Sequence, residues 1–525
     1  MVDFISKEAK GGLPKLRRHV FVALLISLSL TVCLFSASCV GEKQVGPAEA
    51  ETVYRESPSI LGAARKDAYS RSEGSVPFPV APPLVILRGT WAGMGEEYGR
   101  HVGLEIRHVF EGLYRRLEAA GMTRESLRES IGRCRATLED LSPRMLDFME
   151  GIAEGSSAEL RKSVCGTDLE AMEKILFINF FPYLYQISPG FGGDLEEEGS
   201  AWACRGELSS SGEPLVGMNV DATYYPFMYR LAIVVIPDDP DSLIFFTLPV
   251  AGSVGGPFGI NEKGLFIASL PVKSPPAPGS TPGDLGEHQA GAQPVPLPPT
   301  LLSTLALVDS KDVSTSRKAL LFGPGDEAAG ERRKDLISCM PSNYLISDKG
   351  AALVVERDAS HYGLVEEETA PNGGCFIACA DDFTSRESYN ADGDPMGEAM
   401  SAFGLSGEDV LSSGVRRESL RWAFMKLNAS VDIPWLINNA AGMKYIFDEQ
   451  GRRSYQLTDG FGEVVSCYES GLTVDRRLQH GEVPYFGTVC SLVANTGSLE
   501  IRFELGSPSD WVGPWEHVDL HDYQR

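Results

Sequence analysis

The sequence lacks the motifs by which nucleotide-binding and zinc-dependent enzymes are recognised. No G-x-G-x-x-G follows a predicted strand, G-x-x-x-x-G-K-[ST] is missing, and none of the eight His lies in an H-E-x-x-H helix. We therefore expect neither a cofactor nor a metal. Basic charge is also scarce, because 47 Lys and Arg stand against 72 Asp and Glu, for a net charge of -25. A chain this acidic is not expected to bind nucleic-acid backbones or anionic membrane surfaces.

Cysteine is sparse, and its spacing indicates neither a disulfide framework nor a metal site. Two of the ten Cys, Cys33 and Cys39, lie in the N-terminal signal described next, and the spacing of the other eight fixes no pairing. Cys375 and Cys379 form a single C-x-x-x-C without a second pair or a neighbouring His. Structural cysteines are therefore the better interpretation of this pair than metal ligands.

The N-terminus has the layout of a secretory signal. Basic residues between Lys7 and Arg18 precede an apolar, Ser-containing run from Val20 to Phe35, and Ser36-Ala37-Ser38-Cys39 follows. The run is short for a membrane span, which needs roughly 20 residues. A Cys directly after small residues resembles the bacterial lipoprotein signal, in which that Cys carries lipid. We expect export to the bacterial cell envelope with a lipid anchor at Cys39; plain secretion and an uncleaved anchor are the alternatives.

The remaining chain divides by composition into a tether, a helical segment and a strand-rich core. Residues 40–83 are polar and rich in Ala, Ser, Gly and Pro, which is typical of a flexible tether. Residues 84–203 open with a short strand and continue in amphipathic helices. Residues 204–525 carry short β-rich runs bounded by turn residues, with a Pro/Gly-rich insertion at 274–300. Helices first and strands afterwards predict an α+β fold.

Four segments, in order along the chain, carry a family resemblance. Leu87–Thr90 with Met94–Gly99 is similar to an opening strand and a "GxxYG" helix start, and Phe148–Gly155 to an "E-x-x-G-I-A-E-G" segment. Gly212–Asp221 is similar to "D-G-x-x-x-x-G-R-N-x-D", and Gly259–Leu265 to "G-x-N-E-x-G-L". Together they resemble the acyl-coenzyme A:6-aminopenicillanic-acid acyltransferase family (isopenicillin-N acyltransferase-like). Its members are N-terminal-nucleophile (Ntn) hydrolases, with choloylglycine hydrolases as more distant relatives.

The resemblance implies a four-layered αββα sandwich and an autoproteolytic amide chemistry. Members of this class cut their own chain ahead of a Cys, Ser or Thr, whose freed α-amino group serves as the general base for its own side chain. The substrate would be a small molecule with a linear amide, and the acyl-enzyme would be resolved by water or by an amine. The chain is thus expected to be an exported amidohydrolase or acyltransferase.

Cys204 is the first candidate for the nucleophile, because it alone among the Cys lies just before the "G-M-N-V-D" strand. The resemblance gives Asp221 and Asn219 supporting roles beside it, and Arg416 or Arg417 matches a position where relatives carry an active-site Arg. The register is ambiguous, however. Aligned on the turn Gly212, the acyltransferase branch puts its nucleophile at Gly199 or Ser200, and the bile-salt hydrolase branch at Trp202. Ser200 is therefore the second candidate, on the same strand face as Cys204.

Three positions depart from the family pattern. Met218 replaces the Arg of "G-R-N-x-D", Pro271 stands where relatives have an oxyanion-holding Asn, and Asp381 replaces an Asn. A carboxylate at the last position would repel an oxyanion unless it is protonated or paired. These departures motivate the alternative hypothesis, a non-catalytic ligand-binding lipoprotein that retains the fold.

Overall fold

The structure is a computed structural model in which residues Thr52–Arg525 form one compact unit. It describes residues 84–190, 197–223, 229–272, 295–322, 341–357, 362–380, 486–505 and 515–524, together with shorter pieces at 54–55 and between 417 and 469. The predicted signal and most of the predicted tether lie outside these residues. Within the part of the chain that is described, no helix is both long and apolar enough to cross a membrane.

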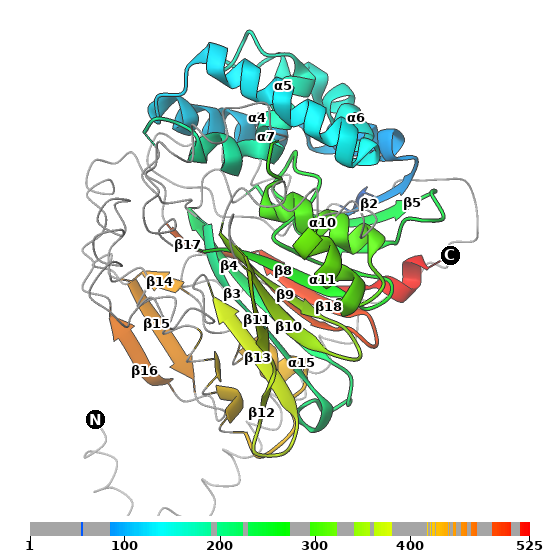
Figure 1. The fold of residues 1–525 in the computed structure, drawn as a ribbon, viewed down its shortest axis with the longest axis vertical. Helices are drawn as coiled ribbons and strands as arrows, with labels where there is room; N and C mark the ends of the chain where they lie inside the picture. The colour runs from blue at the N-terminus through cyan, green and yellow to red at the C-terminus, as the bar shows by residue number, and fades with distance from the viewer. Residues whose placement is uncertain are drawn as a thin grey trace, which may run out of the picture. The chain divides into compact units, whose positions relative to one another are not determined.

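Four helices follow the first long strand and form a layer at the top of Figure 1. They are α4 (Trp91–Ala119), α5 (Arg124–Leu141), α6 (Pro143–Leu160) and α7 (Ala171–Gln186). Their starts follow from the local sequence. Thr90 and Thr123 accept hydrogen bonds from the amides of Gly93 and Ser126, and a Pro opens α6, where a missing N–H costs nothing.

Helices α4 and α6 cross at four glycines, which allow their backbones to touch. A Cβ on Gly95 or Gly99 would lie 2.1 or 2.3 Å from a carbonyl oxygen of α6. On the other helix, a Cβ on Gly151 or Gly155 would lie 2.0 or 2.1 Å from a carbonyl oxygen of α4. The two motifs that carried the family resemblance in this region therefore form one reciprocal helix contact, in which a larger residue would hold the helices apart.

The first sheet has nine strands in the order β1-β2-β5-β6-β7-β8-β9-β10-β11. Neighbours are antiparallel except for β2 and β5, which are parallel. The bounds are β1 Tyr54–Arg55, β2 Leu84–Gly89, β5 Ala232–Pro237, β6 Phe245–Thr247, β7 Phe258–Asn261, β8 Phe266–Pro271, β9 Ser342–Ser347, β10 Ala352–Arg357 and β11 Tyr362–Glu366.

The second sheet has seven antiparallel strands in the order β12-β13-β3-β4-β17-β18-β19. A separate three-stranded sheet follows the order β14-β15-β16. The bounds are β12 Glu368–Thr369, β13 Cys375–Ala380, β3 Glu197–Arg205, β4 Leu215–Thr223, β17 Phe486–Asn495, β18 Glu500–Leu505, β19 Glu516–Asp519, β14 Tyr445–Phe447, β15 Arg453–Thr458 and β16 Val464–Glu469.

The two large sheets pack face to face, and helices cover their outer faces (Figure 1). Helices α10 (Pro299–Asp309) and α11 (Val313–Phe322) lie on the first sheet, and α15 (Ile433–Asn438) contacts β17 of the second. Alternate residues of β3 and β4 therefore point to opposite faces of the second sheet. Ala201 and Met218 belong to the core between the sheets, whereas Trp202 and Leu215 pack under the C-terminal helices. The predicted α+β sandwich with a helical N-terminal segment is confirmed.

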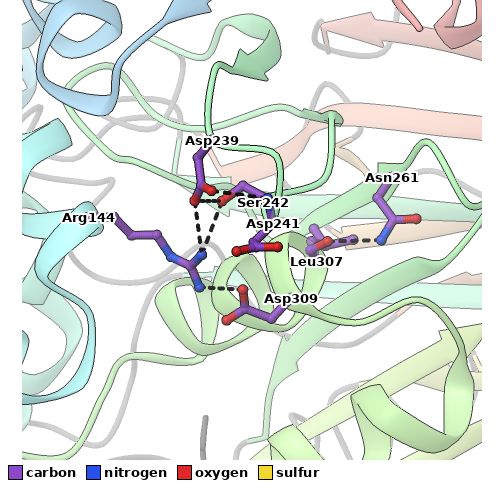
Figure 2. Close-up of polar contacts among 7 residues, drawn as sticks. All are labelled: Arg144, Asp239, Asp241, Ser242, Asn261, Leu307 and Asp309. Atoms are coloured by element: carbon purple, nitrogen blue, oxygen red, sulfur yellow. Dashed lines mark hydrogen bonds and ion pairs between the residues drawn. The ribbon is translucent and has the colours of Figure 1, made fainter. Parts of the chain in front are cut away.

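Polar ties join the helical layer to the sandwich. The Tyr98 hydroxyl of α4 accepts a hydrogen bond from the amide of Gly252 at 2.9 Å, and Asn179 of α7 bonds the carbonyl of Gly252 and the amide of Val254. Figure 2 shows a third tie, in which Arg144 of α6 reaches between two loops of the sandwich. Its guanidinium pairs with Asp309 at the end of α10, and donates to Ser242 at 3.1 Å while facing Asp239 at 3.8 Å.

Candidate active site at the start of strand β3

A row of polar side chains crosses the outer face of the second sheet near the start of β3. The register pairs Ser200 of β3 with Asn219 of β4, Asn219 with Ser491 of β17, and Ser491 with Glu504 of β18. Directly paired residues point to the same face, with their Cβ atoms about 5 Å apart. All four side chains are buried. The Ser491 hydroxyl donates to Asn219 Oδ1 at 2.8 Å, which fixes how this carboxamide is oriented.

Asp221 extends the polar row by one further position along β4. It lies two residues beyond Asn219, and therefore on the same face, opposite Glu198 of β3. Its side chain is buried as well. A β-bulge between Thr488 and Cys490 of β17 lies beside it and interrupts the ladder there. Bulges of this kind commonly re-aim side chains next to functional sites. The structure thus brings together two predicted site residues, Asn219 and Asp221, with Ser200.

Cys204 lies on the same face but in different surroundings. It pairs with Leu215, six residues before Asp221, so the two are separated by roughly 20 Å at about 3.3 Å per residue. The side chain is 1 % exposed, in an apolar cluster with Phe376, Leu420 and others. Burial raises the pKa of the Cys204 thiol, which disfavours the nucleophilic thiolate. The assignment of Cys204 as the nucleophile stays a prediction, and its environment is that of a packed structural cysteine.

Trp202 separates the polar row from the Cys204 cluster. Its indole lies over Gly217, where a Cβ would be 2.4 Å from the ring. A glycine is therefore required opposite the tryptophan. The indole Nε1 is buried and has no hydrogen-bond partner in the part of the chain that the structure describes. Trp202 thus forms an apolar wall along one side of the row.

The remaining sequence candidates are distributed differently. Met218 faces the core between the sheets, so its side chain lies on the opposite side of β4 from Asn219 and Asp221. Pro271 ends β8 and lines a pocket that it shares with Arg230 and residues of α7. Arg416 and Asp381 lie outside the described residues. Neighbouring Arg417 begins a described helical stretch and is half-buried.

Asn261 has a structural explanation. Its Nδ2 donates to the carbonyls of Leu307 and Ser310 at 2.9 and 2.8 Å, and its Oδ1 accepts from the amides of Lys263 and Leu265. The contact with Leu307 is drawn in Figure 2. The "G-x-N-E-x-G-L" segment therefore ties the β7–β8 turn to the end of α10, and its Asn is fully engaged in the fold.

One residue near the row was not assigned a role from the sequence. Asn343 of β9, in the first sheet, donates its Nδ2 to the carbonyl of Ala380 at 2.7 Å. Ala380 is the residue of β13 that pairs with Ser200. Asn343 thus reaches from the first sheet to the backbone of β13, beside the strand that carries Ser200. Only the pairing of strands far apart in sequence brings this carboxamide there.

No metal centre accompanies this cluster: among the residues with a described placement, no group of three or more His, Cys, Asp or Glu is arranged to hold an ion. Among the cysteines with described side chains, Cys165, Cys204 and Cys375 form no disulfide. The polar row itself offers hydroxyl, carboxamide and carboxylate groups.

No family model and no curated protein matches the sequence. Three of the solved structures that resemble it are, by name, a hydrolase, an amidase and an acylase. The first is a mutant conjugated bile acid hydrolase from Clostridium perfringens, with 13% sequence identity over 62% of this chain and 93% of that chain and a TM-score of 0.36. The second is the Caenorhabditis elegans ortholog of N-acylethanolamine-hydrolyzing acid amidase, with 14% identity over 57% of this chain and 93% of that chain and a TM-score of 0.31. The third is penicillin V acylase from Agrobacterium tumefaciens, with 12% identity over 62% of this chain and 80% of that chain and a TM-score of 0.28. Such low TM-scores assign no function, and the relation to the acyltransferase family stays a prediction.

Proposed function

We propose that this chain is an amidohydrolase of the Ntn type whose nucleophile is Ser200. The observation that carries the proposal is the buried row of Ser200, Asn219 and Ser491 at the start of β3, with Asp221 beside it. Of the two candidate nucleophiles from the sequence, the hydroxyl lies among polar partners, whereas the Cys204 thiol lies among apolar side chains. The position of Ser200 also agrees with the register of the acyltransferase branch.

Cleavage of the peptide bond between Gly199 and Ser200 would create the catalytic group. The freed α-amino group of Ser200 then accepts the proton of its own hydroxyl as the oxygen attacks the amide carbonyl. Asp221 lies diagonally across from Ser200 on the same face of the sheet, and its carboxylate would stabilise the protonated form of that amine. The Asn219 carboxamide, oriented by Ser491, can donate to the developing oxyanion. The amine product leaves, and water hydrolyses the ester.

Intact-mass measurement of wild type and three variants tests this function. Wild type should yield two fragments with a new N-terminus at Ser200, Ser200→Ala should remain intact, and Ser200→Cys should still be cut, because a thiol can replace the hydroxyl. Cys204→Ala should be processed as wild type is. If Cys204→Ala stays intact and Ser200→Ala is cut, the nucleophile is Cys204. A wild-type chain that is never cut favours the alternative, a non-catalytic ligand-binding protein.

Substrate chemistry is tested with the processed protein. We propose a linear N-acyl amide as substrate, in line with the predicted family. Free amino acid should be released from a series of N-acyl amino acids, and Asp221→Asn should lower the rate of release by at least tenfold. The reason is that the Asp221 carboxylate is proposed to stabilise the protonated, charged form of the Ser200 amine. Added hydroxylamine should divert product to the hydroxamate if the acyl-enzyme transfers to amines, which distinguishes an acyltransferase from a strict hydrolase.

We also propose that the chain is an exported lipoprotein with Cys39 as its lipid-bearing N-terminus. The support is the basic start, the apolar run and the small residues before Cys39. In a bacterial host, the protein should incorporate radiolabelled palmitate and sediment with membranes. Cys39→Ala should lose the label. A labelled Cys39→Ala protein, or an unlabelled wild type in the medium, contradicts the anchor.

A further inference from the structure

A groove with a mixed polar and apolar lining lies on the outer face of the second sheet, over β17 and β18. It has a volume of about 480 Å³, which is the size of a small-molecule site. We name it the Trp515 groove after the residue just before β19. Its polar lining comes from Ser210, Ser211, Asp432, Asn495, Glu500 and Arg502, and the rest is apolar, from α15, Leu215 and Trp515. No residue of the Ser200 row lines it.

The polar groups of the groove are held in place before any ligand arrives. Arg502 donates from Nε and Nη2 to Glu500 Oε1, at 3.0 and 2.9 Å, which keeps the guanidinium plane fixed. Asn495 Nδ2 donates to Ser211 Oγ at 3.2 Å, while its Oδ1 accepts two backbone amides. Asp432 accepts from the amide of Trp435 at 2.8 Å. Fixed side chains lose little entropy when a ligand binds, so a small ligand gains from each contact.

The charges of the groove select against anions. Glu500 and Arg502 compensate one another, and Asp432 adds a further negative charge, so the three sum to -1. A phosphate or a carboxylate would meet two carboxylates against one guanidinium, which is already hydrogen-bonded. The groove therefore favours a neutral ligand that both donates and accepts hydrogen bonds, because carboxylates only accept and guanidinium groups only donate.

Trp515 adds an apolar surface to this polar lining. It is half-buried and packs against the cluster under the C-terminal helices, so its ring is supported from one side and also lines the groove. An aromatic side chain next to hydrogen-bond donors and acceptors matches a sugar ring, which has C–H groups on its faces and hydroxyls around its edge. We infer that the Trp515 groove binds a neutral saccharide of one or two rings, independently of the chemistry proposed for Ser200.

Titration of the purified full chain with neutral disaccharides tests the inference. The probes are chitobiose, cellobiose and maltose, and binding is followed by tryptophan fluorescence and by saturation-transfer NMR. At least one should bind with a dissociation constant of roughly 0.1 to 1 mM, as is common for a few preorganised contacts. Arg502→Met and Trp515→Leu should each weaken binding at least tenfold. The matched control is Arg135→Met, which breaks an ion pair of similar exposure on α5.

The outcomes separate the possibilities. The inference is overturned if none of the three sugars binds at about 10 mM, which is ten times the weakest dissociation constant expected. Equal binding by Arg502→Met and the control also overturns it, provided that both variants keep the wild-type circular dichroism spectrum. Binding of lysine methyl ester in place of the sugars would assign the groove to a cation, which likewise overturns it. Failure of the Ser200 proposal leaves these results unaffected, because no autoproteolysis is needed.

Discussion

The glycine contact between α4 and α6 yields a prediction whose magnitude follows from the structure. In Gly155→Ala, the new methyl group would lie 2.1 Å from the Glu96 carbonyl oxygen and 2.7 Å from the Arg100 amide. Normal contact needs about 3.4 Å, so the helices must separate by about 1 Å, and a backbone obstacle cannot rotate away. Overpacking of this kind costs about 1–3 kcal/mol, and we expect the upper end. The intrinsic gain of Ala over Gly returns about 0.5–1 kcal/mol, leaving a net loss of roughly 2 kcal/mol.

Gly132→Ala is the matched control, since Gly132 lies inside α5 and its new methyl carbon would have no other atom within 4 Å beyond its own helix. There, only the intrinsic helix preference acts, and the protein should gain about 0.5–1 kcal/mol. Urea denaturation followed by circular dichroism measures the free energy of unfolding of both variants. The reasoning is refuted if Gly155→Ala is as stable as Gly132→Ala, because the close backbone approach would then not limit residue size.

Three further predictions concern single groups. Tyr98→Phe removes the acceptor of the buried Gly252 amide and should lower the free energy of unfolding by about 1–3 kcal/mol in urea denaturation; an unchanged value would mean that water takes the place of the hydroxyl. Native Cys204 should resist iodoacetamide at pH 8 and react fully in denaturant, as measured by peptide mass spectrometry, because burial raises its pKa. Burial also raises the pKa of Asp309 above its unfolded value, against the opposing effect of Arg144. Its stabilising contribution is therefore complete at low pH and is lost as pH rises through the folded pKa, so wild type should lose thermal stability relative to Asp309→Asn as the pH rises above about 4.

The helical segment and its layer were accessible to sequence analysis because their signals are local. Apolar residues at three- and four-residue steps predict a long helix after Gly89, and α4, Trp91–Ala119, lies there. The strand β13 was missed because Cys375–Ala380 is rich in Cys and Ala and lacks an alternating pattern, as buried strands often do. The parallel pairing of β2 with β5 joins segments almost 150 residues apart, for which no local pattern exists.

In the candidate site too, residues with a local sequence signal were predicted and residues placed only by strand pairing were not. Asn219 and Asp221 were found because they lie in one short motif on β4, two residues apart and on one face. Ser491 and Glu504 could not be found, because they join the row only through the pairing of β17 and β18 with β4. The choice between Ser200 and Cys204 also depended on surroundings: the strand period gives both the same face, and only packing distinguishes a polar neighbourhood from an apolar one.

The position of β2 determines whether the two fragments of a cleaved chain could separate. Leu84–Gly89 precedes the proposed cleavage point, yet it lies within the first sheet, hydrogen-bonded to β5. Production of residues 200–525 alone would leave β5, whose side chains are all buried in the intact fold, as a bare edge with unpaired backbone groups, a template for aggregation. The two pieces would therefore be obligate subunits, soluble only when made as one chain or folded together. Maturation would then convert a monomer into a heterodimer without separating its parts.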